Sequence, residues 1–156
     1  SLFSDREALG NNVEAAAKNN ADRFIALLPK IANTKYLYLY SVIDAFYKGI
    51  DGLTPVQIGK TASAITDILS AKPRKDKESR DYYKWARASA ARFAEKAFDK
   101  SDDKKRERIT DQEADAVLDL ALLMCRDDDP TSEYEKKEDG NLDPVKSSHS
   151  ASLCLA

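Results

Sequence analysis

Apolar side chains recur every three or four residues along most of the first 126 residues, which is the spacing of one face of an α-helix. Ser4 and Glu7 form a capping box, so we expect a helix to begin near Asp5. Its apolar stripe continues to Leu28, and Pro29 removes a backbone donor directly afterwards. The pattern therefore predicts a first helix over about residues 5–28.

Tyrosines alternate with leucines from Tyr36 to Tyr40, a pattern that a β-strand would also show. The chain has no second strand-like run, and an unpaired strand would leave its backbone groups without hydrogen bonds. The segment is therefore predicted to be helical. Thr34 can act as its N-cap, and Gly49 can end it in the left-handed conformation.

Two more helices are predicted on either side of Pro73. Thr54 before Pro55 is a helix start, an N-cap followed by proline at the first helical position, and Pro73 stops that helix. The next helix runs from about residue 78 to residue 99. The expected buried faces of the two are Ile58, Ala62, Ile65 and Leu69, and Tyr83, Ala86, Ala90, Phe93 and Ala97.

A last helix begins at a second capping box, formed by Thr110 and Glu113. Its expected buried face is Val117, Leu118, Ala121, Leu122 and Cys125. We expect an all-α fold, most simply an up-and-down bundle of four, or five, helices in residues 1–126. Only five glycines and five prolines in 156 residues agree with a helical rather than a turn-rich chain.

The pattern ends after Arg126, and residues 127–156 read as an extended polar and acidic C-terminal tail that is flexible or ordered only on a partner. Residues 127–144 carry eight acidic and two basic side chains. The preceding 126 residues carry 22 Lys or Arg against 19 Asp or Glu, a net charge of only +3. That surplus is too small for a dedicated nucleic-acid-binding domain. No apolar run is long enough to predict a transmembrane helix.

Residues with catalytic or metal-binding chemistry are sparse. His149 is the only histidine and lies in the tail, so we expect no histidine-based catalytic or metal site in the bundle. Asp115 and Asp119 lie one turn apart, opposite the expected apolar face, and are interpreted as a solvated surface rather than a metal site. No catalytic residue, cofactor or metal is predicted, and the protein is not expected to be an enzyme.

Two further features admit two interpretations each. Gly59-Lys60-Thr61 is similar to the end of a phosphate-binding loop, but Thr54 stands where that loop needs its first glycine. Gly59 is instead interpreted as allowing close helix approach. Tyr82, Tyr83 and Trp85 among cations could stack on nucleic-acid bases, although a role in filling the core or an interface is favoured.

The two cysteines, Cys125 and Cys154, could form one disulfide or remain free thiols. Cys125 lies on an apolar helix face, which favours a buried structural thiol. The sequence leaves open whether they are joined.

The segment "TDILSAKPRKDKESRDYYKWARASAARFAEKAF" resembles the middle of the PsbQ family of extrinsic photosystem II proteins. The matching element is Ser70-Ala71-Lys72-Pro73, followed by a charged turn and a long helix. The polar tail makes the four-helix extrinsic subunit of diatoms and the red lineage the closer comparison. The resemblance implies a four-helix bundle in the chloroplast thylakoid lumen, peripheral to the membrane, and a chain that begins at Ser1 fits removal of a transit peptide.

The function that the resemblance implies is not enzymatic. Such a subunit docks on the membrane-bound photosystem II core and on other extrinsic subunits, and it helps retain the calcium and chloride of the oxygen-evolving centre. The cations expected to dock are Lys72, Arg74, Lys75 and Lys77. The alternatives are a structural or adaptor bundle of another assembly, such as a virion component, and a helical nucleic-acid-binding protein.

Overall fold

The computed structural model describes residues 2–73 and 77–126, with side chains described at residue 8 and over residues 11–73 and 81–126. Across these ranges the chain is all-helical and forms no strand, which confirms the predicted fold class. The predicted tail, residues 127–156, lies outside the described residues. The helices are α1 (Leu2–Asn19), α2 (Ala21–Thr34), α3 (Tyr36–Lys48), the 3₁₀ turn η1 (Ile50–Gly52), α4 (Pro55–Leu69), α5 (Lys77–Phe98) and α6 (Asp111–Cys125).

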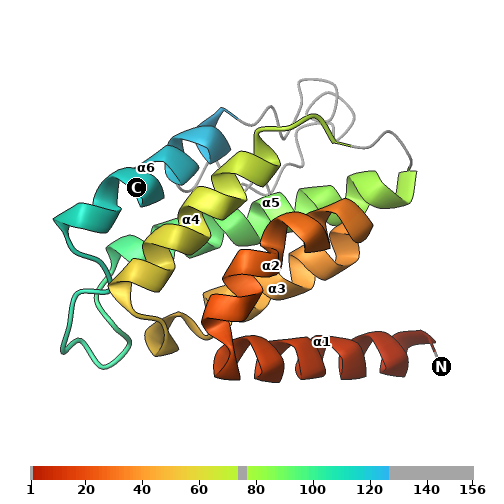
Figure 1. Ribbon diagram of the computed structural model, residues 1–156, viewed down its shortest axis with the longest axis horizontal. Helices are drawn as coiled ribbons and strands as arrows, with labels where there is room; N and C mark the ends of the chain where they lie inside the picture. Colours follow the sequence, from red (N-terminus) through yellow and green to blue (C-terminus); the bar gives the residue numbers. More distant parts are fainter. Residues whose placement is uncertain (1, 74–76, 127–156) are drawn as a thin grey trace, which may run out of the picture.

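The long helix α5 lies at the centre of the molecule and packs against α3 on one side and α6 on the other (Figure 1). Helix α4 packs against α6 and α2, and α1 lies along one edge of the molecule, where it contacts α3. The interior is built mainly from aliphatic side chains and alanines. Alanines on α5, including Ala86, Ala90 and Ala94, are fully buried, and their small side chains suit a helix with neighbours on two sides.

The first predicted helix is two helices, and the predicted break at Pro29 is wrong. The chain leaves the helical conformation at Asn20, with φ −138° and ψ 48°, and Pro29 lies inside α2. Proline costs a helix one backbone hydrogen bond. Pro29 is exposed, and burial of Ile25 and Leu28 just before it and Ala32 just after it holds α2 together through this position.

The tyrosine-rich segment is helix α3, as predicted, and it buries Tyr36, Leu39 and Phe46 among others. Its predicted N-cap is wrong. Thr34 is the last residue of α2 and donates its hydroxyl to the Ile31 carbonyl, which leaves Lys35 at the junction. Gly49 does end the helix, but at φ −97° rather than in the left-handed conformation.

Helix α4 begins at Thr54 and Pro55, as predicted, and Thr54 also forms a complete capping box with Gln57 that was not predicted. Thr54 Oγ1 accepts from the Gln57 N–H at 3.2 Å, and the Gln57 side chain accepts from the Thr54 N–H at 2.9 Å. The helix ends at Leu69, four residues before the proline that was expected to stop it. The expected buried faces of α4 and α5 are confirmed at every position.

Helix α6 also begins at its predicted capping box, in which Thr110 and Glu113 bond reciprocally. Its predicted buried face is confirmed at Val117 and Ala121 and is wrong at Leu118 and Leu122, which are 47% and 46% exposed. The buried set is Glu113, Val117, Leu120, Ala121 and Met124. The apolar positions of α6 run almost all round the helix, so the sequence pattern alone did not show which side faces α4 and α5.

Candidate functional site

The turn between α4 and α5, which carries the predicted docking cations, is anchored by two side chains of α5. Tyr83 Oη donates to the carbonyl of Leu69, the last residue of α4, at 3.1 Å. Arg87 Nη1 donates to the same carbonyl at 3.3 Å. Arg87 Nη2 reaches the Leu123 carbonyl near the end of α6 at 3.5 Å. The C-terminal ends of α4 and α6 therefore meet at Arg87, where their carbonyls gain donors that a helix end otherwise lacks.

Of the four predicted docking residues, the structure places one side chain. Lys72 is exposed in the turn that follows α4. Arg74 and Lys75 lie outside the described residues. Lys77 is the first residue of α5, and its side chain also lies outside them. The gathering of the four cations into one surface stays a prediction.

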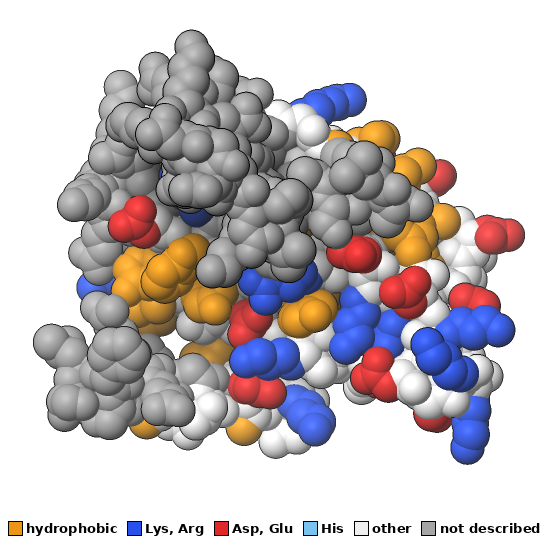
Figure 2. All heavy atoms as spheres, turned by 180° about the vertical axis from the view of Figure 1, so that it is seen from behind, with side chains coloured by type: hydrophobic (Ala, Val, Ile, Leu, Met, Phe, Trp, Pro, Cys, Tyr) orange, Lys and Arg blue, Asp and Glu red, His pale blue; other side chains and the backbone are white. Residues whose placement is uncertain are grey.

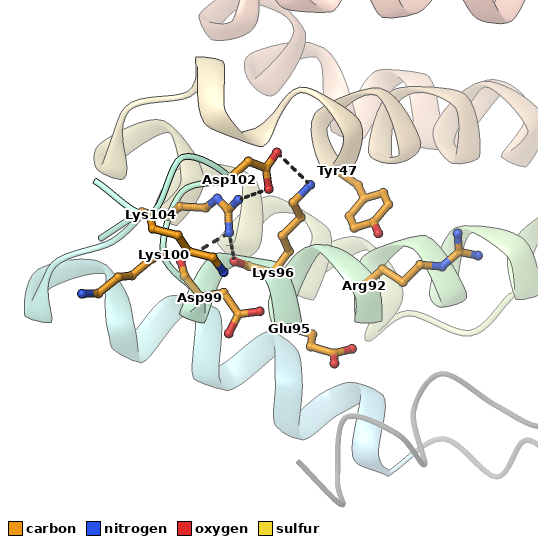
Figure 3. A pocket seen from close by; sticks show the side chains of 9 residues that line it. Tyr47, Arg92, Glu95, Lys96, Asp99, Lys100, Asp102 and Lys104 are labelled. Atoms are coloured by element: carbon orange, nitrogen blue, oxygen red, sulfur yellow. Dashed lines mark hydrogen bonds and ion pairs between the residues drawn. The ribbon is translucent and has the colours of Figure 1, made fainter. Parts of the chain in front are cut away.

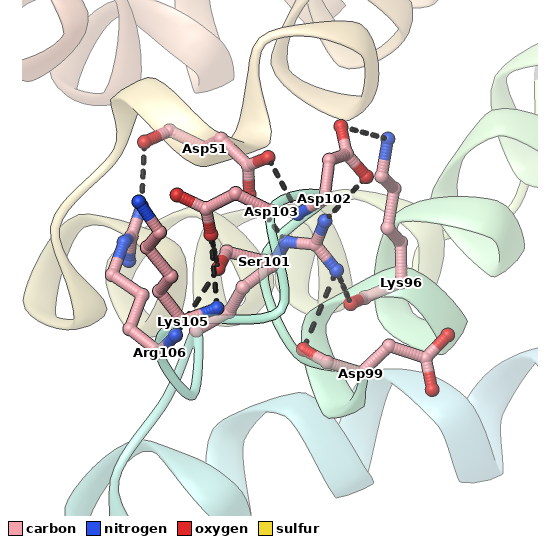
Figure 4. Close-up of polar contacts among 9 residues, drawn as sticks. Asp51, Lys96, Asp99, Ser101, Asp102, Asp103, Lys105 and Arg106 are labelled. Atoms are coloured by element: carbon pink, nitrogen blue, oxygen red, sulfur yellow. Dashed lines mark hydrogen bonds and ion pairs between the residues drawn. The ribbon is translucent and has the colours of Figure 1, made fainter.

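A second polar cluster surrounds Arg108, in the loop between α5 and α6. Figure 4 shows Asp51, Asp102 and other members of this cluster. The Arg108 side chain is only 1% exposed. The guanidinium donates from Nε to Asp51 Oδ1 at 2.7 Å and from Nη2 to Asp102 Oδ1 at 2.9 Å. Nη1 donates to the carbonyls of Lys96 at 2.9 Å and Asp99 at 3.3 Å. One buried cation thus ties η1, the end of α5 and the loop together.

Asp51 is the other centre of this cluster. Its second carboxylate oxygen accepts from the Asp102 N–H at 3.0 Å, and its carbonyl accepts from Arg106 Nη2 at 2.5 Å. The hydrogen bond from Arg108 is the largest of the effects that lower the pKa of Asp51 from 3.8 to about 2. Within the loop, the Asp103 carboxylate accepts from the hydroxyl of Ser101, and this hydrogen bond is the main cause of the lowered pKa of Asp103.

An open pocket of about 290 Å³ lies beside Arg108, between α3, the end of α5 and the loop (Figure 3). Tyr47 lies between two cations of α5: the Arg92 guanidinium carbon is 5.9 Å from the ring centre and Lys96 Nζ is 5.2 Å from it. Arg92 Nε is buried and has no hydrogen-bond partner among the described residues. Lys96 also lies 3.7 Å from Asp102.

The charges of this pocket are close to balance only when Asp51, which pairs with Arg108 but lies outside the lining, is counted. Arg108 and Lys96 are offset by Asp51 and Asp102, which are their ion-pair partners. The remaining cations of the lining are Arg92, Lys100 and Lys104, and the remaining carboxylates are Glu95 and Asp99. The lining contains no cysteine, histidine or serine, the side chains most often used as nucleophile or base. Its arrangement suits a solvated ion network that holds the loop in place.

Other predictions about chemistry can be followed through the described residues. No group of three or more potential ligands among them could hold a metal ion, and none of their helices is long and apolar enough to cross a membrane. Asp115 and Asp119 are both exposed, as predicted. The interpretation of Gly59 is confirmed, because a Cβ there would lie 2.9 Å from Glu113 Cγ.

Trp85 and Cys125 were each expected to be buried in the bundle or, for Trp85, to lie in an interface. Trp85 is 53% exposed, so it does not fill the core, and its place in an interface stays a prediction. Its ring lies edge-on to Tyr40 and Tyr82, with centroids 5.7 and 5.2 Å away. Cys125 is disulfide-bonded and half-buried, and so it is not the buried free thiol that was favoured. Cys154 and His149 lie outside the described residues.

On the face that Figure 2 draws, the described residues show charges of both signs mixed with apolar areas. No large field of one charge stands out on this face, in keeping with the small net charge of residues 1–126. A search for similar proteins gave no match among protein-family models, curated proteins or solved structures.

Proposed function

We propose that this protein is a non-catalytic extrinsic subunit that docks on the lumenal side of photosystem II and stabilises its oxygen-evolving centre, including calcium and chloride retention. Its partners would be the membrane-bound core and the other extrinsic subunits, and its location the thylakoid lumen. The resemblance in residues 66–98 supports this assignment.

In this proposal, α3, α4, α5 and α6 act as an up-and-down four-helix body, with α1 and α2 added at its edge and residues 127–156 as an extension. The packing of α3 on α5, of α5 on α6 and of α4 on α6 is consistent with such a body. The alanine-rich face of α5 is buried, and close-packed interiors yield little. Helix α5 can therefore hold the turn that precedes it in place for a partner.

The observation that carries the proposal is the position of Lys72. It is exposed in a short turn whose first residues follow an α4 terminus that Tyr83 and Arg87 anchor to α5. Because the end of α4 just before it is anchored, Lys72 loses less conformational freedom on binding, which favours its use as a contact. Together with Arg74, Lys75 and Lys77 it would pair with carboxylates on the photosystem, and added salt would screen these contacts.

The disulfide at Cys125 adds a requirement. Disulfide bonds persist in oxidising compartments and are rare where thiols are kept reduced. The proposal therefore requires that the lumen keep Cys125 oxidised in the working protein.

Salt washing of oxygen-evolving membranes tests the proposal. We expect the protein to leave the membranes at high salt, to rebind when the salt is lowered, and to restore oxygen evolution on rebinding. Replacing all four docking cations by glutamine should weaken rebinding by at least about fourfold, since each exposed ion pair contributes roughly 0.2–1 kcal/mol and four contribute at least about 0.8 kcal/mol. Lys60→Gln is the matched control, because Lys60 is an exposed lysine on α4 outside the turn.

The outcome that would refute the proposal is a protein that never associates with these membranes at any salt concentration. An adaptor role in another assembly would then be the better account. If the four-residue variant and the control rebind equally, the turn is not the docking surface.

A further inference from the structure

Helix α6 presents an apolar face that no described residue covers. Leu118 and Leu122 lie one turn apart on it and are 47% and 46% exposed. Cys125 follows three residues after Leu122, so it lies on the same face at the end of the helix. Single exposed leucines are ordinary on protein surfaces. Here two of them lead directly to a disulfide-bonded cysteine.

The sequence indicates which segment of the chain covers this face of α6. It contains only one other cysteine, Cys154, and that residue stands between Leu153 and Leu155 in an otherwise polar tail. We propose that a Cys125–Cys154 disulfide fastens the C-terminal segment, residues 151–156, onto the exposed face of α6, where its leucines cover Leu118 and Leu122.

The dimensions of a disulfide allow this contact. The Cα atoms of a bonded cysteine pair lie about 4.4–6.8 Å apart, and neighbouring Cα atoms in a chain are about 3.8 Å apart. Leu122 precedes Cys125 by about 4.5 Å along the helix axis, and Leu118 by about 10.5 Å. Both leucines that flank Cys154 would therefore be held within side-chain reach of Leu122, and one of them within reach of Leu118.

The fastening would also give the acidic segment a defined place. Residues 127–153 would form a loop with both ends at the C-terminal end of α6. That end lies next to the turn after α4, because Arg87 bonds the carbonyls of both Leu123 and Leu69. This inference does not depend on photosystem II docking, and its tests use the isolated full-length chain.

Peptide mapping without reductant gives the first test. We expect a linked peptide pair containing Cys125 and Cys154, from a protein that runs as a monomer in non-reducing electrophoresis. A disulfide-linked dimer would assign the face of α6 to a second copy instead and would overturn the proposal. Two free thiols in the oxidised, folded protein would overturn it as well.

Thiol–disulfide exchange tests whether the leucines touch. Two glutathione molecules reduce the protein disulfide to two thiols and become one oxidised glutathione, so the equilibrium constant reports how strongly the fold favours the bond. Leu118→Ala with Leu122→Ala, and Leu153→Ala with Leu155→Ala, form a double-mutant cycle. Leu118 and Leu122 lie outside the core, and the tail substitutions leave the residues of the core unchanged, so we expect every variant to keep its helical circular dichroism.

We expect each pair of substitutions to shift the thiol–disulfide equilibrium toward the reduced protein. The shift with both pairs together should be smaller than the product of the two separate shifts, because both pairs remove the same contacts. The expected coupling is about two- to tenfold. Val56→Ala, at a residue on α4 that is 53% exposed, is the matched control and should leave the constant unchanged in every background. Independent effects of the two pairs would show that the tail leucines do not pack on α6, and would overturn the proposal even if the disulfide is present.

Discussion

Replacing Arg108 by methionine is the sharpest test of how the α5–α6 loop is held. Methionine keeps much of the aliphatic volume and removes the guanidinium. It deletes the ion pairs with Asp51 and Asp102 and the hydrogen bonds to the carbonyls of Lys96 and Asp99. We expect the variant to fold, because the apolar core of the bundle is unchanged, but to be clearly less stable.

The magnitude follows from what each partner loses. A hydrogen bond to a charged group contributes about 1.5–3 kcal/mol, and removal of one member of a buried ion pair costs about 3–5 kcal/mol. The side chains of Asp51 and Asp102 are 35% and 72% exposed, so water can partly replace their lost partner. The two carbonyls at the end of α5 gain no new protein donor. We therefore expect a net loss of about 3 kcal/mol, at the lower end of the range for buried pairs.

Urea unfolding followed by circular dichroism measures this loss directly. A loss of about 3 kcal/mol corresponds to a melting temperature lower by roughly 10 °C in a domain of this size. Lys100→Met is the control, since Lys100 is exposed and lies 3.9 Å from its partner Glu107, a surface pair of little value. A loss below about 1 kcal/mol in the Arg108 variant would refute the argument that this buried cation organises the loop.

Three further predictions concern other parts of the structure. The pKa of Asp51 is lowered from 3.8 to about 2 in the folded protein, so the stability it contributes is complete above pH 4 and is lost as the pH falls toward 2. Acid titration of unfolding should therefore show a smaller loss between pH 4 and 2 for Arg108→Met than for the parent, and equal losses would contradict this origin of the shift. Gly59→Ala should be destabilising by about 1 kcal/mol despite alanine's higher helix propensity, because the new Cβ would press on Glu113 and disturb the cap of α6; a more stable variant in urea would show that Glu113 moves aside freely. Trp85, the only tryptophan, should be quenched readily by acrylamide, and strong protection would mean that its exposed face is covered.

The parts of the fold that follow local rules could be predicted from the sequence. Thr54 and Thr110 begin helices because each has a Gln or Glu three residues later to complete a capping box. The buried faces of α4 and α5 follow from a single apolar stripe on each helix. These signals lie within a few residues of the feature they determine.

The errors arise where tertiary contacts decide between local alternatives. Pro29 is a strong helix-breaking signal, but burial of the residues around it outweighs that signal. Helix α6 carries apolar residues on several sides, so only its contacts with α4 and α5 select Val117 and Leu120 for the core and leave Leu118 outside.

The polar cluster could not have been found from the sequence. Arg108 ends a run of charged residues that reads as a solvated loop, and nothing nearby distinguishes it from the exposed Arg106. Its burial depends on Asp51, 57 residues earlier in the chain. The predicted docking cations stand out in the sequence, unlike Arg108. The structure describes the side chain of only one of them, Lys72.

The central claim, that the turn after α4 docks on photosystem II, is tested most directly by cross-linking from that turn. A photo-reactive amino acid at position 72 would be compared with the same group at position 56, an exposed site at the other end of α4. After rebinding to salt-washed membranes, the protein labelled at position 72 is expected to cross-link to photosystem II subunits, and high salt should abolish the products. Equal yields from positions 72 and 56, or no product from position 72 while the protein is bound, would contradict the claim.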